Sequence, residues 1–441
     1  MGLKPGKAQR LTAPGLAARA TALELLLSVL GHKKPFDEAL AQHQGMKKLD
    51  ASDRGFVRQV CATTLRRLGQ VDALIDHCLD KPLPKRAEDI RYILRLGVTQ
   101  ILFLKTPPHA AVDTAVNLAD VYGFKPQKGF VNAILRRIAK EGEALMAAQH
   151  AGRLNTPDWL WQTWCDTYGE ETAGRIAEAH LKEPPLDLTV KKDPDAWAAT
   201  LEGPVLPNGS VRRTGGGSVP ELPGYKEGAW WVQDVAAALP VSLFGDVKGK
   251  TIIDLCAAPG GKTAQLIQAG ASVIAVDRAE GRLKTLRDNL KRLDLKAEII
   301  KADSRTWRPA EPVDGVLIDA PCTATGTIRR HPDISWLKQP GDISAVATIQ
   351  QALLQAAAAM IKPGGTIVYC TCSLQIEEGP AQISAFLSHQ DNWIRDPIRG
   401  DEVFGFNDWL TEEGALRTLP HDLDEHGGMD GFFAARLKQA S

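Results

Sequence analysis

The spacing of apolar residues predicts a helical domain in the first third of the chain. In residues 88–104 the apolar side chains recur at intervals of three and four, and residues 129–139 repeat that spacing. These intervals place side chains on one face of an α-helix, so both segments are predicted to be amphipathic helices. Prolines separate the helical segments at positions 82, 84, 107, 108 and 126. We therefore expect an all-α domain over residues 1–145.

Beyond residue 250 the pattern changes to short β-rich runs separated by helical segments. The runs are TIIDLC, VIAVD, EIIKAD, GVLIDAPC and TIVYCTCS, and between them lie GGKTAQLIQAG, EGRLKTLRDNLKRL and DISAVATIQQALLQAAAAM. This alternation is typical of a doubly wound, mostly parallel sheet covered by helices on both faces. We assign this Rossmann-like α/β domain to residues 241–441, and we expect ligands at the carboxyl ends of its strands.

Residues 150–240 carry a mixed signal. Trp159, Trp161 and Trp164 fall in a predicted helix, whereas PNGSVRRTGGGSVPELPG is rich in turn residues and PLDLTV has the composition of a short strand. The pattern indicates a small mixed α/β lobe that connects the two domains.

Length and composition indicate a soluble protein with more than one domain. With 441 residues the chain is too long for one ordinary core, and its 44% hydrophobic and 24% charged residues are typical of a soluble globular protein. No apolar run reaches the length of a membrane span, and the first residues lack the apolar core of a signal peptide. We therefore expect a cytoplasmic protein without a membrane partner.

A formal net charge of zero conceals an asymmetry along the chain. Residues 1–150 hold 23 Lys and Arg against 14 Asp and Glu, a net charge of +9, and the remainder carries −9. A basic domain on an acidic body suits a polyanion-binding appendage, although a solvated, lysine-rich helix surface would give the same count.

The first predicted strand of the α/β domain is followed by CAAPGGK. Its glycines let backbone amides approach a ligand at the start of a helix. The segment lacks the first glycine of a phosphate-binding loop and the glycine spacing of a dinucleotide fold, so a ligand with an amino-acid part and a nucleoside part fits better. The expected binding residues of this loop are Cys256, Ala257, Ala258, Pro259, Gly260, Gly261 and Lys262.

Aspartates mark the ends of the next three strands. Asp277 is placed to accept hydrogen bonds from ribose hydroxyls, and Asp303 could hold an adenine ring. The alternative for both is a turn aspartate. Asp319 ends the fourth strand, three positions before a cysteine.

Two cysteines lie at the ends of strands that we expect to be neighbours, Cys322 in DAPC and Cys372 in TIVYCTCS. A structural metal would need about four ligands with close paired spacing, so no metal is expected. A disulfide is disfavoured in the cytosol, and the seven cysteines are scattered along the chain. Cys370, one step back inside the strand, is predicted to be a small buried hydrophobe.

A thiol beside a methyl donor suits one reaction in particular. Carbon 5 of cytosine is a poor nucleophile, and addition of a thiolate to carbon 6 turns it into an enamine that can attack an electrophilic methyl group. A carboxylate near N3 of the base eases this addition, and a second group must then help to remove the proton from carbon 5 and expel the thiolate. Nearby, Arg329, Arg330 and His331 suit phosphate contacts, unless they simply face solvent.

These motifs, in this order, resemble one family. DLCAAPGGKTAQL, DAPCTATGTIRRHPDISW and VYCTCSLQIEEG, preceded by WWVQDVAA and followed by GGMDGFFAARL, resemble the bacterial RNA cytosine-5 methyltransferases of the Sun/Fmu type in the RsmB/NOP family, which act on small-subunit ribosomal RNA. In the helical domain, DRGFVRQVCATTLRR and KGFVNAILRR resemble the NusB-type RNA-binding domain that this family carries at its N-terminus. The likeness extends over nearly the whole chain and is weakest from 150 to 220.

The resemblance implies roles for the candidate residues. Cys372 would be the nucleophile, Cys322 would help to release the product, and Asp319 would lie near N3 of the base. S-adenosylmethionine would be held by residues 256–262 with three carboxylates, Asp277, Asp303 and Asp319. Apart from the resemblance, we expect the connecting lobe to contact RNA and take a monomer as the default oligomeric state.

The sequence departs from the family pattern at three positions. Thr323 replaces a common serine, Ile376 a frequent proline and Gly379 a frequent asparagine.

Two other functions compete with this prediction. The first is the same chemistry on transfer RNA or on DNA, and DNA is disfavoured because the cysteine of the PC pair attacks in DNA cytosine methyltransferases. The second is a non-catalytic RNA-binding or ribosome-assembly factor, against which stand the complete donor loop and both cysteines.

Overall fold

The computed structural model describes residues 15–84 and 88–440, and contacts divide the chain into two compact units. The first unit extends to Leu181 and also includes Ile328–Gln339, and the second comprises Lys182–Thr327 together with the chain from Pro340 onward. The expected lobe at 150–240 is therefore split, because its helical first part groups with the N-terminal unit and its strands with the second. Among the described residues, no helix is long and apolar enough to cross a membrane.

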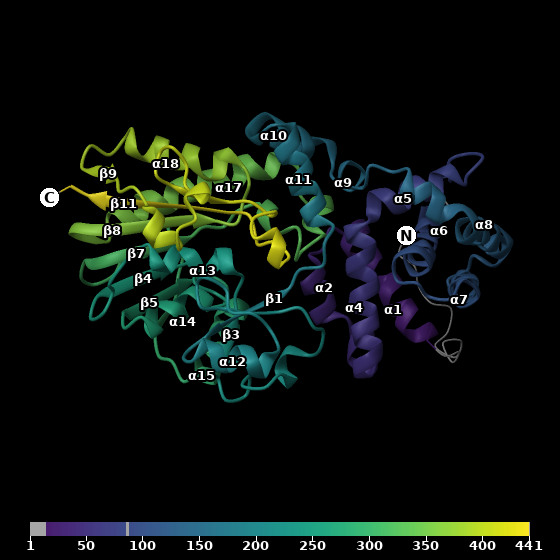
Figure 1. Cartoon of the computed structure of the whole chain (residues 1–441), viewed down its shortest axis with the longest axis horizontal. Helices are drawn as coiled ribbons and strands as arrows, with labels where there is room; N and C mark the ends of the chain where they lie inside the picture. The colour runs from purple at the N-terminus through teal and green to yellow at the C-terminus, as the bar shows by residue number, and fades with distance from the viewer. Residues whose placement is uncertain (1–14, 85–87, 441) are drawn as a thin grey trace. The chain divides into compact units, whose positions relative to one another are not determined.

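The first unit is helical, as the spacing of its apolar residues predicts (Figure 1). Residues 88–104 form α6 (Glu88–Val98) followed by a π-helical turn at Thr99–Phe103, and residues 129–139 lie within α8 (Lys128–Ala147). The helices α6 and α8 pack closely, since a Cβ atom on Gly97 would lie 2.6 Å from Leu135 Cδ1. The other helices are α1 (Leu16–Leu26), α2 (Phe36–Gln42), α3 (Gln44–Lys48), α4 (Ala51–Arg66), α5 (Leu68–His77), α7 (Pro108–Val121), α9 (Ala151–Leu154), α10 (Asp158–Tyr168), α11 (Glu170–His180) and α16 (Ile334–Leu337).

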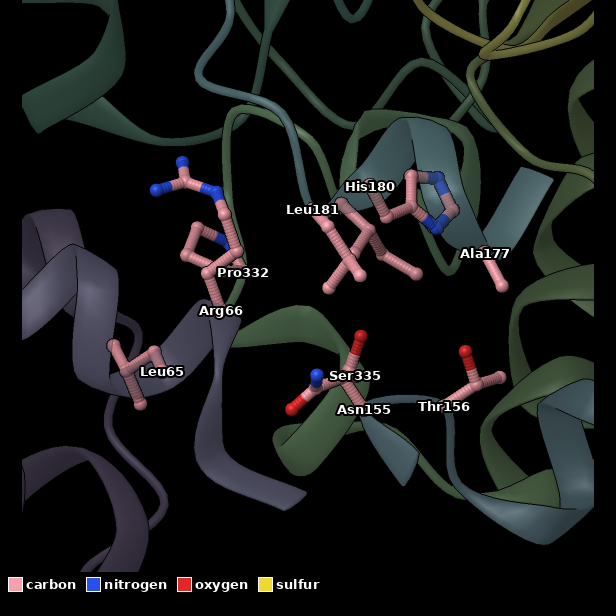
Figure 2. A pocket seen from close by; sticks show the side chains of 10 residues that line it. Leu65, Arg66, Asn155, Thr156, Ala177, His180, Leu181, Pro332 and Ser335 are labelled. Atoms are coloured by element: carbon pink, nitrogen blue, oxygen red, sulfur yellow. The ribbon is translucent and has the colours of Figure 1, made fainter. Parts of the chain in front are cut away.

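The segment Ile328–Gln339 is fastened to α4 and α2 by polar contacts. The indole of Trp336 donates to the carbonyl of Leu65 at 2.8 Å, and Asp333 Oδ2 accepts from the backbone of Phe36 at 2.9 Å. A cavity of about 10 Å³ lies between this segment and α11 (Figure 2). It has room for about one water molecule and is therefore too small for a methyl donor.

The second unit contains a small sheet and a large one. The small sheet has the order β2-β1-β3 and is antiparallel, with β1 (Leu186–Val190) formed by the predicted strand PLDLTV. Its other elements are β2 (Val211–Arg213), β3 (Trp230–Val232) and α12 (Pro194–Leu201).

The large sheet has the order β10-β11-β8-β7-β4-β5-β6, with β9 paired to β11. The five strands from β6 to β8 are parallel and the C-terminal strand β11 is antiparallel to β8, so the sheet is mixed but mostly parallel, as predicted. Its strands are β4 (Thr251–Leu255), β5 (Ser272–Asp277), β6 (Glu298–Lys301), β7 (Val313–Asp319), β8 (Ile361–Thr371), β9 (Trp393–Arg395), β10 (Leu416–Thr418) and β11 (Phe432–Gln439).

Helices cover both faces of the large sheet because its parallel strands are apolar on both sides. Ile252 of β4 belongs to a core with α13 (Val235–Ser242) and α14 (Gly261–Gln268), whereas the next residue, Ile253, packs in a core with α17 (Pro340–Ala358) and α18 (Pro380–Leu387). Helix α15 (Glu280–Arg292) packs with α14 over β5. This arrangement confirms the doubly wound fold.

Candidate active site

The predicted site residues collect at the carboxyl edge of the large sheet. Strand β4 lies between β5 and β7, and β8 follows β7, so the loops after these four strands are neighbours. The chain builds outward from β4 to β6 on one side and continues from β7 on the other. That reversal of strand order is where ligands bind in doubly wound sheets.

The loop after β4 is held in place by α15. Cys256 takes a φ of +63°, an uncommon conformation for a residue other than glycine, and Gly260 takes +101° where α14 begins. Asn289 donates to the carbonyl of Pro259 at 3.0 Å, and Arg282 donates to that of Ala258. Arg282 and Asn289 lie on a helix remote in sequence, and no sequence signal marked them.

Asp277 and Asp303 differ in how they are engaged. Asp277 is buried, and its oxygens accept from the backbone of Ala258 at 3.4 Å and of Ala279 at 3.0 Å. Asp303 is partly exposed and binds both the backbone and the guanidinium of Arg305, which lowers the pKa of Asp303 to about 2. Asp303 thus has the contacts of a turn aspartate, and its role toward adenine stays a prediction.

Asp254 is a buried carboxyl beneath the donor loop. Thr263 donates to its Oδ2 at 2.6 Å, while its Oδ1 has no hydrogen-bond partner among residues 15–84 and 88–440. Burial raises the pKa of Asp254 to about 7. A proton on Oδ1, or a hydrogen-bond donor from a ligand, would satisfy the hydrogen-bonding capacity of this buried oxygen.

Lys262 and Asp319 form a charged pair between the donor loop and the thiols. Lys262 Nζ lies 2.8 Å from Asp319 Oδ2, and the ammonium also lies 5.0 Å from the centre of the Phe432 ring. Burial favours a lower pKa for Lys262, but the charge of Asp319 outweighs it and the pKa is raised. The partner of Lys262 in the structure is thus the carboxylate of Asp319.

Cys322 and Cys372 come together, with their sulfurs 3.4 Å apart. The hydrogen bond to Cys372, followed by burial, raises the pKa of Cys322 well above its usual range, so Cys322 keeps its proton. Cys370 is fully buried, as predicted for a small hydrophobe. Gly326 donates its backbone N–H to the carbonyl of Cys372 at 2.9 Å and ties the two loops together.

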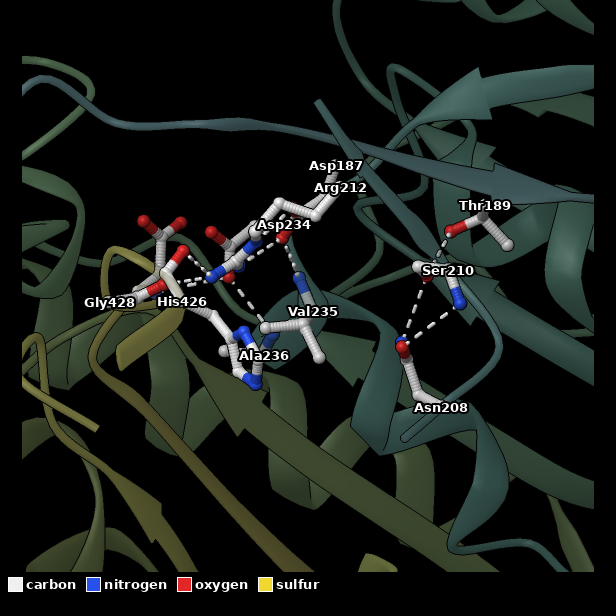
Figure 3. A network of polar contacts seen from close by, with 11 residues as sticks. Asp187, Thr189, Asn208, Ser210, Arg212, Asp234, Val235, Ala236, His426 and Gly428 are labelled. Carbon is white, nitrogen blue, oxygen red and sulfur yellow. Dashed lines mark hydrogen bonds and ion pairs between the residues drawn. The ribbon is translucent and has the colours of Figure 1, made fainter. Parts of the chain in front are cut away.

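The C-terminal motif GGMDGFF closes the site from another side. Gly431 donates to the carbonyl of Gly326 at 2.9 Å, an approach so close that a Cβ on Gly326 would lie 1.9 Å from Gly431 O. Upstream of the motif, Arg212 binds both oxygens of Asp187 at 2.7 Å and donates to the carbonyl of Gly428 (Figure 3). The small sheet thereby helps to position the C-terminal motif.

The three residues predicted to contact RNA phosphates belong to the first unit and differ in exposure. Arg329 is only 1% exposed, so its burial contradicts a phosphate contact in this conformation. His331 lies 3.2 Å from Asp37 Oδ2 and is half-buried. Arg330 is exposed and stays a predicted RNA contact. An arginine pair in sequence cannot reveal that one member packs inward.

One important group was not singled out by the sequence. Glu378 is completely buried beside the two thiol loops and accepts hydrogen bonds from Thr323 and Ser373. The sequence shows only two adjacent glutamates after an apolar strand, and nothing in that pattern separates the buried Glu378 from the exposed Glu377.

The residues at this edge fit S-adenosylmethionine. The loop of residues 256–261 leads into the N-terminus of α14, where free backbone amides suit a carboxylate. Asp277 offers carboxylate oxygens at the end of the next strand, and Asp319 lies toward the thiols with 36% of its side chain exposed. Bound there, the donor supplies an electrophilic methyl group on a sulfonium centre.

Comparisons with known proteins identify the family of the chain. Residues 242–438 match the family described as 16S rRNA methyltransferase RsmB/F, and residues 16–140 match the NusB family. Ribosomal RNA small subunit methyltransferase B of Enterobacter sp. (strain 638) is 38% identical over 410 residues, which cover 89% of this chain and 92% of that protein. The protein of the same name from Vibrio vulnificus (strain YJ016) is 34% identical over 441 residues, with 96% and 99% covered.

Solved structures agree on the fold. The crystal structure of PH0851 superposes with a TM-score of 0.75 at 24% identity and covers 99% of this chain and all of that one. With its two domains in the expected order, the chain therefore belongs to the RsmB/F family of 16S rRNA methyltransferases, and it is an S-adenosylmethionine-dependent methyltransferase with an N-terminal NusB domain.

Proposed function

We propose that the protein transfers the methyl group of S-adenosylmethionine to carbon 5 of a cytosine in small-subunit ribosomal RNA, through a covalent bond between Cys372 and carbon 6. The observation that carries this proposal is the approach of Cys322 and Cys372 to 3.4 Å beside the Lys262–Asp319 pair. Two thiols and one carboxylate next to a methyl-donor loop are the groups that this reaction needs.

The first half of the reaction uses Cys372 and Asp319. The thiolate of Cys372 bonds to carbon 6, and the electron pair of the ring's 5,6 double bond becomes available at carbon 5, which takes the methyl group. As this bond forms, the carboxylate of Asp319 takes the thiol proton of Cys372 and gives it to N3 of the base, and N3 releases that proton to solvent once the 5,6 double bond has formed again. The ion pair keeps the ammonium group of Lys262 beside the carboxylate of Asp319.

The second half of the reaction belongs to Cys322. Its pKa is raised first by the hydrogen bond to Cys372 and then by burial, and also by the charge of a Cys372 thiolate. Once Cys372 is bonded to carbon, that charge and that hydrogen bond are lost, so Cys322 can release its proton to solvent. The Cys322 thiolate then takes the proton from carbon 5, the bond from sulfur to carbon 6 breaks, and the 5,6 double bond forms again.

The substrate is an unpaired cytosine. A thiol and a methyl donor can reach carbons 6 and 5 only if the base leaves its stack, which costs least in a single-stranded loop. Ribosomal RNA is favoured because the curated relatives are named small-subunit ribosomal RNA methyltransferases. The NusB domain and Arg330 are proposed to contact that RNA.

A trapping experiment tests this function. The Cys322→Ala protein is incubated with S-adenosylmethionine and, separately, unmodified small-subunit ribosomal RNA, transfer RNA or a DNA duplex. We expect a denaturant-resistant complex with ribosomal RNA alone, because attack proceeds while release is blocked. Cys165→Ala, which removes a thiol from the first unit, is the control and should turn over without accumulating a complex. Absence of any complex in Cys322→Ala, while the wild type methylates RNA, would contradict the proposed role of Cys322.

A further inference from the structure

Glu378 is a buried carboxylate that the reaction scheme has not used. It ends the 3₁₀ turn Ile376–Glu378 after β8 and is 0% exposed. Burying a carboxylate is costly unless its oxygens are fully hydrogen-bonded. Such a group is retained in a core only where its contacts serve the fold or the site.

Four uncharged donors converge on the two oxygens of Glu378. Thr323 donates its backbone N–H to Oε2 at 2.8 Å and its hydroxyl to Oε1. The Ser373 hydroxyl donates to Oε1 at 2.8 Å, and the side-chain amide of Gln350 on α17 donates to Oε2 at 3.2 Å. Each oxygen therefore accepts two hydrogen bonds, from N–H groups at Oε2 and from hydroxyls at Oε1, and the buried carboxylate is fully hydrogen-bonded.

The two anchors of Glu378 are the residues directly after the two thiols. Thr323 follows Cys322 at the end of β7, and Ser373 follows Cys372 at the end of β8. Their hydroxyls also lie 3.1 Å from each other. One carboxylate thus holds both thiol loops at once.

We propose that Glu378 is a positioning residue, which fixes the approach of Cys322 to Cys372 and thereby controls how fast the covalent RNA intermediate is released. This inference rests on the proposed function of the two thiols. Because Glu378 is 0% exposed, it acts through the Thr323 and Ser373 contacts. Its negative charge also contributes to the raised pKa of Cys322, which makes the Cys322 thiolate a stronger base once it forms.

Replacement of the carboxylate by an amide tests this role. In Glu378→Gln the carbonyl oxygen can still accept from the two N–H groups at the Oε2 position. The NH₂ group at the Oε1 position makes the hydroxyls of Thr323 and Ser373 accept where they had donated, so the charge and both hydroxyl anchors of the carboxylate are lost with little change in volume. Glu377→Gln is the matched control, because the neighbouring Glu377 is exposed and the same charge is removed. Both full-length proteins are measured in single turnover with small-subunit ribosomal RNA, together with their affinity for S-adenosylmethionine.

We expect Glu378→Gln to bind the donor as the wild type does and to lose methyl transfer by about 10- to 100-fold, the scale of a misplaced catalytic group. The intermediate should decay more slowly, and the alkaline rise of its decay rate should move to lower pH because the pKa of Cys322 falls. Glu377→Gln should match the wild type. Methyl transfer and intermediate decay within twofold of the wild type in Glu378→Gln would overturn the proposal.

Two further variants guard against a folding failure. Thr323→Val removes only the hydroxyl anchor, and Ser373→Ala removes only the other one. If Glu378→Gln does not fold, each of these should still slow release of the intermediate, and unchanged release in both would overturn the proposal. The Cys322→Ala trap separates the two proposals. A trapped complex there with normal release in Glu378→Gln contradicts only the role of Glu378. No trapped complex, while the wild type methylates RNA, contradicts the role of Cys322 on which this inference rests.

Discussion

The donor side of the active site (residues 256–262 with Asp277 and Asp319) and the thiol side (Cys322, Cys372 and the polar residues after them) hold their carboxylates differently. On the donor side, Asp319 is 36% exposed and is paired with the ammonium of Lys262. On the thiol side, Glu378 is wholly buried and is held by neutral donors alone.

The two carboxylates differ in whether they can exchange their hydrogen-bond partners when a ligand binds. A partly exposed ion pair can rearrange when a cofactor or a base arrives, because solvent and ligand can replace each partner. A buried carboxylate with four donors has no such alternative, since each lost hydrogen bond leaves a buried polar group unsatisfied. The Lys262–Asp319 pair on the donor side is therefore adaptable, and the Glu378 contacts on the thiol side are preassembled.

The largest effect that distinguishes the two sides should come from Asp319→Asn. The amide cannot give a proton to N3 of the base, and it leaves the buried ammonium of Lys262 without its counter-charge. Methyl transfer at saturating donor should fall by roughly 10²- to 10³-fold, the usual contribution of a general acid or base. Single-turnover methylation measures this loss.

Asp314→Asn is the matched control for that variant. Asp314 lies at the opposite end of the same strand, β7, and is paired with Lys362 at 2.9 Å. Its replacement removes a carboxylate from a lysine pair without touching the site, so methylation should stay within about threefold, as for most surface substitutions. Equal losses in Asp314→Asn and Asp319→Asn would show that Asp319 acts only through stability.

Much of the donor side could be predicted from the sequence. Buried parallel strands are continuous apolar runs in the sequence, and the polar residues that end them meet at one edge of the sheet. The pattern alone therefore predicted that the loop at Cys256, Asp277 and the two thiols would lie at the carboxyl edge. The resemblance to a family then supplied the roles of Cys322 and Cys372.

The rest depends on tertiary pairing that the sequence does not display. Glu378 acquires its role from Thr323 and Gln350, which lie far before it in the chain. The segment Ile328–Gln339 groups with the helical unit because Trp336 and Asp333 find partners there, not because of its own pattern. The predicted helix that contains Trp159, Trp161 and Trp164 is found at α10, but only packing decides which unit that helix joins.

A smaller effect is expected from Asp254→Asn and concerns stability. Because burial raises the pKa of Asp254 from 3.8 to about 7, the folded protein holds a proton that the unfolded chain has released. The folded state therefore loses relative stability as the pH rises from about 4 to about 7, by on the order of 4 kcal/mol in total.

The amide that this substitution introduces does not ionise, so the variant should gain stability over the wild type across this pH range. Urea unfolding at pH 5, 6, 7 and 8 measures the difference. Asp391→Asn removes an exposed carboxyl from the same unit and should show no such gain. Unfolding midpoints of Asp254→Asn that run parallel to those of the wild type at every pH would contradict the buried carboxyl.

We propose that Cys372 attacks the base and that Cys322 releases the product. The identity of the residue that carries the covalent bond to RNA tests these two roles together. The complex trapped by Cys322→Ala is digested with nuclease and protease, and the modified peptide is identified by mass spectrometry. If Cys372 is the nucleophile, a single nucleotide is attached to the peptide that contains Cys372, at that sulfur, and no complex forms when Cys372 is also replaced by alanine. A nucleotide attached to another residue, or a complex that persists in the double variant, would contradict that role of Cys372.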